Sequence, residues 1–125
     1  MDITPLIKSD QQVIQSYAGG VFKVSGVAYS QAVFVFPNET AVWNAGDFES
    51  LSVADFEILI ARSADIDVVL LGCGAKMRFL KPELRAALKA RGLSVDVMDS
   101  GAACRTYNVL MAEGRRVAAA LAGRR

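Results

Sequence analysis

One pattern occurs twice in the second half of this chain: an apolar segment, a glycine-containing loop and then a helix-forming segment. The first copy is the apolar run at residues 66–71 followed by the loop 72–76, and the second is the run 95–98 followed by residues 99–105. Two such units predict a parallel sheet flanked by helices. In open sheets of this kind, ligands bind beyond the carboxyl ends of the strands, where both loops are expected to lie.

The remaining pattern predicts a β-rich first third and alternating helices and strands after it. Residues 13–17 and 21–24 are expected to form a hairpin that turns at Gly19-Gly20, and residues 32–36 and 41–44 a second pair. Apolar spacing predicts a helix from Ser52 to about Ser63, and Pro82 and Gly92 mark the two ends of another. The near-continuous apolar run at 65–71 is expected to be a central strand.

The last segment is ambiguous between two structures. Residues 117–121 are Val-Ala-Ala-Ala-Leu, which can continue the helix that begins near Ser100, because alanine favours helix. We favour a final strand instead, since Gly114 suits a helix end and short buried strands are often uniformly small and apolar. These elements together predict one α/β domain over residues 1–125. The pattern predicts an N-terminal β-meander, a partly parallel sheet and flanking helices.

Composition narrows the function classes. The chain has no histidine, so histidine is unavailable as a general base or as a metal ligand, and we expect no metal site and no catalytic triad. Two cysteines are expected to be free thiols. No apolar run reaches the ~20 residues of a membrane span, and no secretory signal is visible. We therefore expect a cytoplasmic protein without membrane insertion.

Charge is divided unevenly along the chain. Residues 1–72 carry three basic and nine acidic side chains, whereas residues 73–125 carry eleven basic and four acidic ones. A basic half can attract an anion or an acidic protein surface. The simpler interpretation, which we favour, is a solvated helix face that carries Arg85, Lys89 and Arg91. The pattern contains no aromatic interleaving typical of nucleic-acid binding, so no nucleic-acid partner is expected.

The candidate site is a crevice between the loops 72–78 and 99–108. We expect it to hold a ligand or partner through residues of both loops: Gly72, Gly74, Lys76, Arg78, Asp99, Ser100, Ala103, Cys104, Arg105 and Asn108. The two glycines also fit a turn that serves packing alone. We favour this interpretation, because the dinucleotide fingerprint and the P-loop motif are both incomplete. Lys76 and Arg78 are either anion ligands or ordinary surface charges.

The start of the last helix allows two alternatives. The N–H groups of Ala102, Ala103 and Cys104, together with Arg105, form an anion site if they are unpaired. Alternatively, Asp99 or Ser100 accepts hydrogen bonds from the same groups, which is the outcome we favour.

The side chains of this helix start leave their roles open. A thiol in the first helical turn has a lowered pKa, whereas a buried thiol is inert. Cys73 lies at the equivalent place in the other loop, so the two sulfurs could approach across the crevice. Without histidine to activate either thiol, we expect no catalytic cysteine. Asn108 is expected to bind a loop or a ligand, or to form a local hydrogen bond. Trp43 is expected to anchor the β-meander to the core.

Two long segments, residues 98–110 and 113–121, closely resemble the Mth-like domain-of-unknown-function family. The resemblance continues through Tyr17-Ala18-Gly19-Gly20, Trp43, the loop 71–74 and Pro82-Glu83-Leu84. It implies a three-layer α/β domain with a mixed sheet and a final strand. Members usually have threonine where Ser100 stands, and the residue at Cys73 varies, which argues against a shared thiol mechanism.

The family resemblance implies a role without established catalysis. One mitochondrial member acts with partners in the assembly of respiratory complex I, and the missing transit peptide suggests a bacterial version here. We therefore expect a non-catalytic protein-interaction or respiratory-complex assembly module, with an unknown protein partner and no cofactor. The alternative is a small-anion-binding protein, or an uncharacterised enzyme, that uses the crevice.

Overall fold

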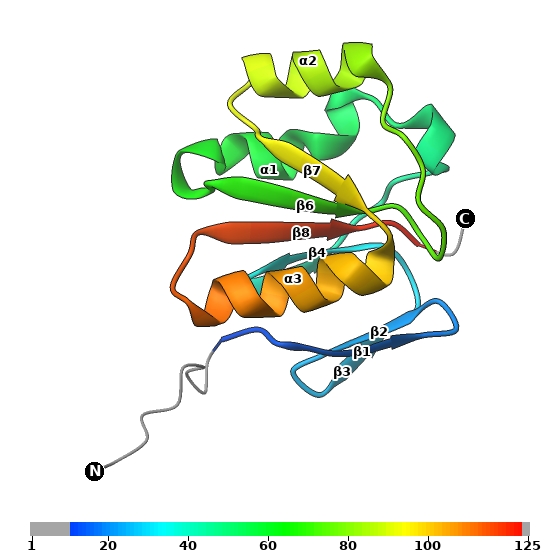
Figure 1. Ribbon diagram of the computed structural model, residues 1–125, viewed down its shortest axis with the longest axis vertical. Helices are drawn as coiled ribbons and strands as arrows, with labels where there is room; N and C mark the ends of the chain where they lie inside the picture. Colours follow the sequence, from blue (N-terminus) through cyan, green and yellow to red (C-terminus); the bar gives the residue numbers. More distant parts are fainter. Residues whose placement is uncertain (1–10, 124–125) are drawn as a thin grey trace.

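The computed structural model describes residues 11–123, so both ends of the expected domain lie outside the described residues. Within these residues, five strands come first, and three α-helices and three further strands follow (Figure 1). The strands are β1 Ile14–Ala18, β2 Val21–Val24, β3 Val27–Tyr29, β4 Val33–Phe36, β5 Glu39–Val42, β6 Val68–Gly72, β7 Val95–Met98 and β8 Val117–Leu121. The helices are α1 Glu57–Ala61, α2 Pro82–Ala90 and α3 Ser100–Ala112, and short 3₁₀ turns occupy Phe48–Ser50, Val53–Phe56 and Ser63–Asp65.

The main sheet has five strands in the order β5-β4-β8-β6-β7. β8, β6 and β7 are parallel, and β4 pairs antiparallel with both β8 and β5. The expected mixed, partly parallel sheet is therefore confirmed. So is the final strand, because β8 is buried along its whole length between β4 and β6. β6 is an interior strand as expected, although β8 occupies the centre of the sheet.

The N-terminal meander is a separate three-stranded sheet, β1-β2-β3. Its first hairpin turns at Gly19 and Gly20, which both have positive φ, and this confirms the turn expected from the sequence. β3 was not expected, because three residues after the turn at Ser25-Gly26 are too short to show a strand pattern. β5 also differs from the expectation: it begins at Glu39, directly after Pro37-Asn38, because two residues suffice to reverse the chain.

The layers form because alternate residues of the main sheet face opposite sides. On one side, Phe34 and Leu71 pack with α1 and α2; on the other, Val35 and Leu70 pack with α3 and the three-stranded sheet. α3 and the three-stranded sheet lie side by side over that second face (Figure 1). The expected three-layer α/β class is confirmed. None of the helices in residues 11–123 has the length and apolarity that a membrane span requires.

A buried aromatic side chain anchors the segment that follows β5. Trp43 lies outside β5 but is buried; its ring stacks on Phe34 at 4.8 Å and its indole N–H donates to the Asp55 carbonyl at 2.8 Å. The expected anchoring role is confirmed. The Asp55 carboxylate accepts from the Ser52 N–H at 2.8 Å, which caps the start of the turn that follows. The expected continuous helix is wrong, because a 3₁₀ turn comes first and α1 is only five residues long.

Candidate functional site

The loops that follow β6 and β7 meet directly. The Ser100 N–H donates to the Gly74 carbonyl at 2.8 Å, and the Gly74 N–H donates to the Ser100 Oγ at 2.9 Å. The Cys73 N–H donates to the Met98 carbonyl at 3.0 Å. Ser100 is fully buried, so its hydroxyl holds the two loops together from within. Backbone contacts therefore occupy the place where the sequence predicts a crevice.

Gly72 makes this close approach possible. A Cβ atom at this position would lie 3.0 Å from both the Leu121 Cδ2 and the Ser100 Oγ, and 3.1 Å from the Ser100 Cα. Real Cβ atoms essentially never come closer than this. Gly74 has a φ of 106°, which side chains rarely adopt. The structural interpretation of both glycines is confirmed.

The other residues of the expected crevice point in two different directions. Arg78 lies beside Glu49, with 3.5 Å between the guanidinium and the carboxylate, and 5.9 Å from the Phe48 ring. Arg105 instead lines a small hollow against β1, together with Cys104 and Asn108. Ser100 brings the two loops together, and the side chains of Arg78 and Arg105 lie away from that contact. A ligand or partner role for the ten residues stays a prediction.

The start of α3 is capped by the protein itself. The Asp99 carboxylate accepts from the Ala102 N–H at 2.9 Å, and the Asp99 carbonyl accepts from the Ala103 N–H at the same distance. The capping alternative is thus confirmed, with Asp99 rather than Ser100 as the cap. The anion-site alternative is wrong for these donors, because they already have acceptors.

Neither thiol is poised for reaction. Burial raises the pKa of Cys104 to about 12; the neighbouring Arg105 opposes this shift without overcoming it. The alternative in which this first-turn thiol has a lowered pKa is therefore wrong, because desolvation has a larger effect on the pKa than the adjacent cation. Cys73 packs in the core on the opposite face of the sheet from Cys104. The two sulfurs accordingly do not meet across a crevice.

Asn108 and Tyr107 join α3 to the strand β1. The Asn108 side chain accepts from the Ile14 N–H at 2.9 Å and donates to the Ile14 carbonyl at 2.8 Å. The Tyr107 hydroxyl donates to the Gln12 carbonyl at 2.9 Å, and burial raises the pKa of that hydroxyl. Of the expected roles for Asn108, the structure shows the binding of a neighbouring segment.

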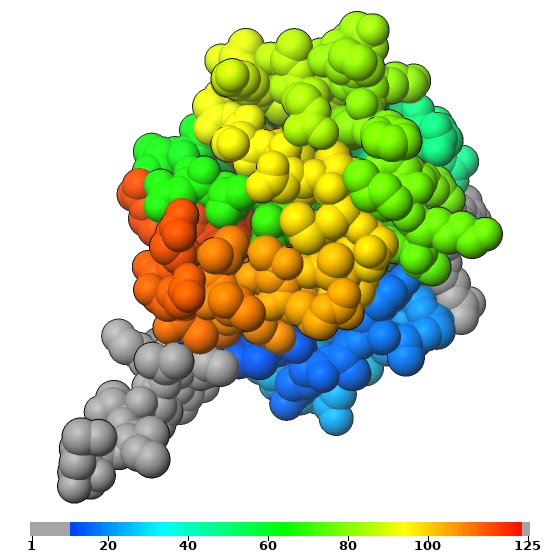
Figure 2. All heavy atoms as spheres, in the orientation of Figure 1, coloured from blue at the N-terminus to red at the C-terminus, as the bar shows by residue number. Residues whose placement is uncertain are grey.

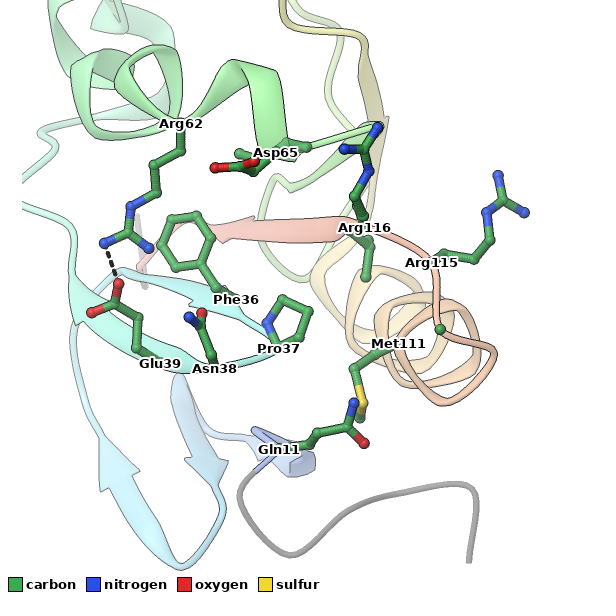
Figure 3. A pocket seen from close by; sticks show the side chains of 13 residues that line it. Gln11, Phe36, Pro37, Asn38, Glu39, Arg62, Asp65, Met111, Arg115 and Arg116 are labelled. Atoms are coloured by element: carbon green, nitrogen blue, oxygen red, sulfur yellow. Dashed lines mark ion pairs between the residues drawn. The ribbon is translucent and has the colours of Figure 1, made fainter.

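A cavity of about 600 Å³ lies at the opposite edge of the sheet, by the amino ends of β6 and β8 (Figure 3). This volume is within the range of small-molecule sites. Five separate segments supply its walls: the chain before β1, the turn after β4, the 3₁₀ turn before β6 with the residues next to it, the last turn of α3 and the residues that lead into β8. The lining residues are Gln11, Phe36, Pro37, Asn38, Glu39, Arg62, Asp65, Ile66, Met111, Gly114, Arg115, Arg116 and Val117.

Ion pairs organise the charged wall of this cavity. Arg62 pairs with Glu39, and its guanidinium lies 4.3 Å from the centre of the Phe36 ring (Figure 3). Arg116 binds Asp67 through two nitrogen atoms, at 2.7 and 3.2 Å. Its hydrogen bonds and charge lower the pKa of that carboxyl. The lining thus combines apolar side chains with three arginines and two carboxylates, and two of the arginines are already ion-paired.

The sequence pattern marks few of these cavity residues. The pair Arg115-Arg116 after Gly114 was the available signal, but it gave no position relative to Phe36 or Arg62. Groups of three or more metal-binding side chains are also absent from residues 11–123. The chemistry that this region presents is therefore that of guanidinium groups, the carboxylates of Glu39 and Asp65, side-chain amides and an aromatic ring.

The chain is similar to known proteins along most of its length. Residues 14–122 match the model of a protein family of unknown function, DUF498/DUF598. The chain belongs to this family. Over 109 residues it is 36% identical to the NADH dehydrogenase [ubiquinone] 1 alpha subcomplex assembly factor 3 of Danio rerio. That alignment covers 87% of this chain and 63% of the relative, so the chain spans less than two thirds of the assembly factor's length.

Solved structures of bacterial family members share this architecture. A Bordetella parapertussis protein is 34% identical, with a TM-score of 0.81 over 90% of this chain and 96% of its own. A Bordetella pertussis protein described as an Mth938-like domain is 27% identical, with a TM-score of 0.78 over 98% of this chain and 90% of its own. The resemblance to the Mth-like family, inferred from the residues 98–110 and 113–121, is confirmed.

Proposed function

We propose that this chain is a non-catalytic interaction module that acts in the assembly of a respiratory complex. The observation that carries the proposal is the 36% identity to a complex I assembly factor across 87% of the chain. The alignment spans 109 of the 125 residues, which supports a role shared with the matching region of the relative. The partner is then a subunit or an assembly intermediate of the complex. We place the protein in the cytoplasm of a bacterial cell.

The internal contacts support a binding role rather than a chemical one. Cys104 and Tyr107 are the two groups with strongly raised pKa values, and burial is the cause for both. The side chains of Ser100 and Asn108 form hydrogen bonds with backbone groups of neighbouring segments. The polar residues that suggested a reactive site from the sequence thus stabilise the fold.

Deletion of the gene in its native host tests the proposal. We expect a lower amount of mature respiratory complex I and an accumulation of subassemblies on native gels, both restored by the wild-type chain. A tagged chain should co-purify with identified subunits of the complex, and cell fractionation checks its location. Normal complex levels in the deletion strain, with no respiratory subunit on the tagged chain, would refute the assembly role.

A second candidate function is small-anion binding, now placed in the cavity instead of the loop crevice. The observation that favours it is the volume of about 600 Å³ with Arg62, Arg115 and Arg116 in its lining. Inorganic phosphate titrated into labelled protein should shift NMR signals of residues 36–39 and 114–117. Arg115→Ala should weaken these shifts, and Arg105→Ala, which lies in the sequence-predicted crevice, should not. Shifts confined to residues 99–105 would refute the cavity.

A further inference from the structure

The loop between β6 and α2 exposes apolar side chains on a held backbone. Phe79 is 87% exposed and Met77 is 50% exposed, whereas Leu80 is buried in the core between them and α2. The loop, yellow-green in Figure 2, protrudes at the right of the molecule. An aromatic ring exposed to this degree contributes little to the packing of its own chain.

Four contacts hold this loop in place. The Cys73 thiol donates to the Lys76 carbonyl at 3.3 Å and accepts from the Arg78 N–H at 3.2 Å. Leu80 anchors the far end of the loop in the core, and the Arg78 side chain lies against Glu49. The two apolar side chains are therefore presented by an ordered backbone, which lowers the entropy cost of binding.

The charges around Phe79 identify the chemistry of a partner. Lys76 and Lys81 are exposed on either side of the apolar pair, and Arg78 lies between its two members. We propose that Met77 and Phe79 dock into an apolar pocket with an acidic rim on a partner protein. This inference rests on the proposed function, because the partner is then a component of the respiratory complex under assembly. Buried aromatic anchors ringed by polar contacts are the usual hot spots of protein interfaces.

A protein pocket fits this loop better than an anionic lipid surface. Arg78 is directed toward Glu49, whose side chain is 72% exposed, and Glu83 is exposed in the first turn of α2. Two carboxylates beside the apolar pair would be repelled by a negatively charged bilayer. A partner protein can set the acidic side chains of its rim opposite Lys76 and Lys81 and single cations opposite these two carboxylates, so mixed charge around the loop favours a shaped protein surface.

The test compares Phe79→Ala with Val109→Ala, since Val109 is a 57% exposed apolar residue on α3, away from the loop. Both variants should keep the wild-type melting temperature, because neither side chain is packed. We expect Phe79→Ala to weaken retention of the respiratory subunits by about thirtyfold, as for an interface hot spot, and Val109→Ala to leave it unchanged. Lys76→Glu should weaken retention less, and only at low salt.

A photo-crosslinking phenylalanine analogue at position 79 identifies the contact. It should crosslink to a respiratory subunit at a site rich in Asp and Glu, and the same analogue at position 109 should not. If wild type and Phe79→Ala retain the subunits equally, the docking loop is refuted while the assembly role stands. If wild type retains no respiratory subunit and position 79 gives no crosslink, both proposals fail.

Vesicles test the lipid alternative with the same variants. We expect no more binding to vesicles of phosphatidylglycerol and phosphatidylcholine than to phosphatidylcholine alone. Binding to the phosphatidylglycerol vesicles that Phe79→Ala abolishes and Val109→Ala preserves would overturn the protein-docking proposal, because the loop would then be a membrane contact.

Discussion

Removal of the Asn108 side chain should detach the three-stranded sheet from α3. In Asn108→Ala, the Ile14 N–H and carbonyl lose partners at 2.9 and 2.8 Å, and Ile14 is only 4% exposed, so water does not readily replace them. Two hydrogen bonds lost from buried backbone groups cost about 2 to 4 kcal/mol of unfolding free energy. For a domain of this length, that corresponds to a melting temperature roughly 8 to 16 °C lower.

Urea unfolding and hydrogen exchange measure this effect. The Asn108→Asp variant keeps the acceptor for the Ile14 N–H but sets a carboxylate against the Ile14 carbonyl, so we expect it to be destabilised as well. Amide exchange should increase more in residues 14–29 than in β6, because the smaller sheet separates first. Asn44→Ala, at an exposed asparagine, serves as the control and should stay within about 0.5 kcal/mol of wild type. Wild-type stability of Asn108→Ala would refute the reasoning.

Three further predictions concern other contacts. Gly72→Ala should lower the unfolding free energy by about 1 to 2 kcal/mol in thermal melts, because the added Cβ atom overpacks against Ser100. Gly46→Ala is the control: its Cβ atom meets open space, so the change should be neutral or slightly stabilising in the same melts. Burial raises the pKa of Cys104 from 9.0 to about 12, so the buried neutral thiol stabilises the fold fully below pH 9, and this stabilisation is lost as the pH rises from 9 towards 12. Cys104→Ala should therefore show a shallower alkaline loss of stability in urea titrations, and an equal slope would contradict the shift. The hydrogen bonds and charge of Arg116 lower the pKa of Asp67 from 3.8, so this pair stabilises the fold above pH 3.8 and the effect fades as the pH falls below that value. The difference in stability between wild type and Asp67→Asn should therefore become smaller at low pH and in high salt. A difference independent of pH would argue against the pair.

Local patterns predicted most elements because they depend on nearby residues. The turn at Gly19-Gly20 and the start of α2 at Pro82 follow from backbone preferences alone. The strand 117–121 was correctly distinguished from a helix by its small apolar residues after Gly114. β3 was missed, since three residues carry too little alternation to show a period.

The candidate site was harder to predict, because its geometry depends on strand order. The two loops after β6 and β7 do lie together, as expected for neighbouring parallel strands. Their contact is closed by Ser100 and Gly72, and the cavity of about 600 Å³ lies at the other edge of the sheet. No spacing in the sequence relates Phe36 to Met111, which line the same cavity from segments far apart.

The sequence alone determined the types of element and the layered α/β class, because period, glycine and proline act over a few residues. The tertiary structure decided which strands are neighbours, with β8 between β4 and β6, and thereby which groups are removed from water. Burial then set the raised pKa of Cys104 and left the arginine-rimmed cavity open. Desolvation and enclosed volume arise from contacts between distant segments, which is why local patterns do not reveal them.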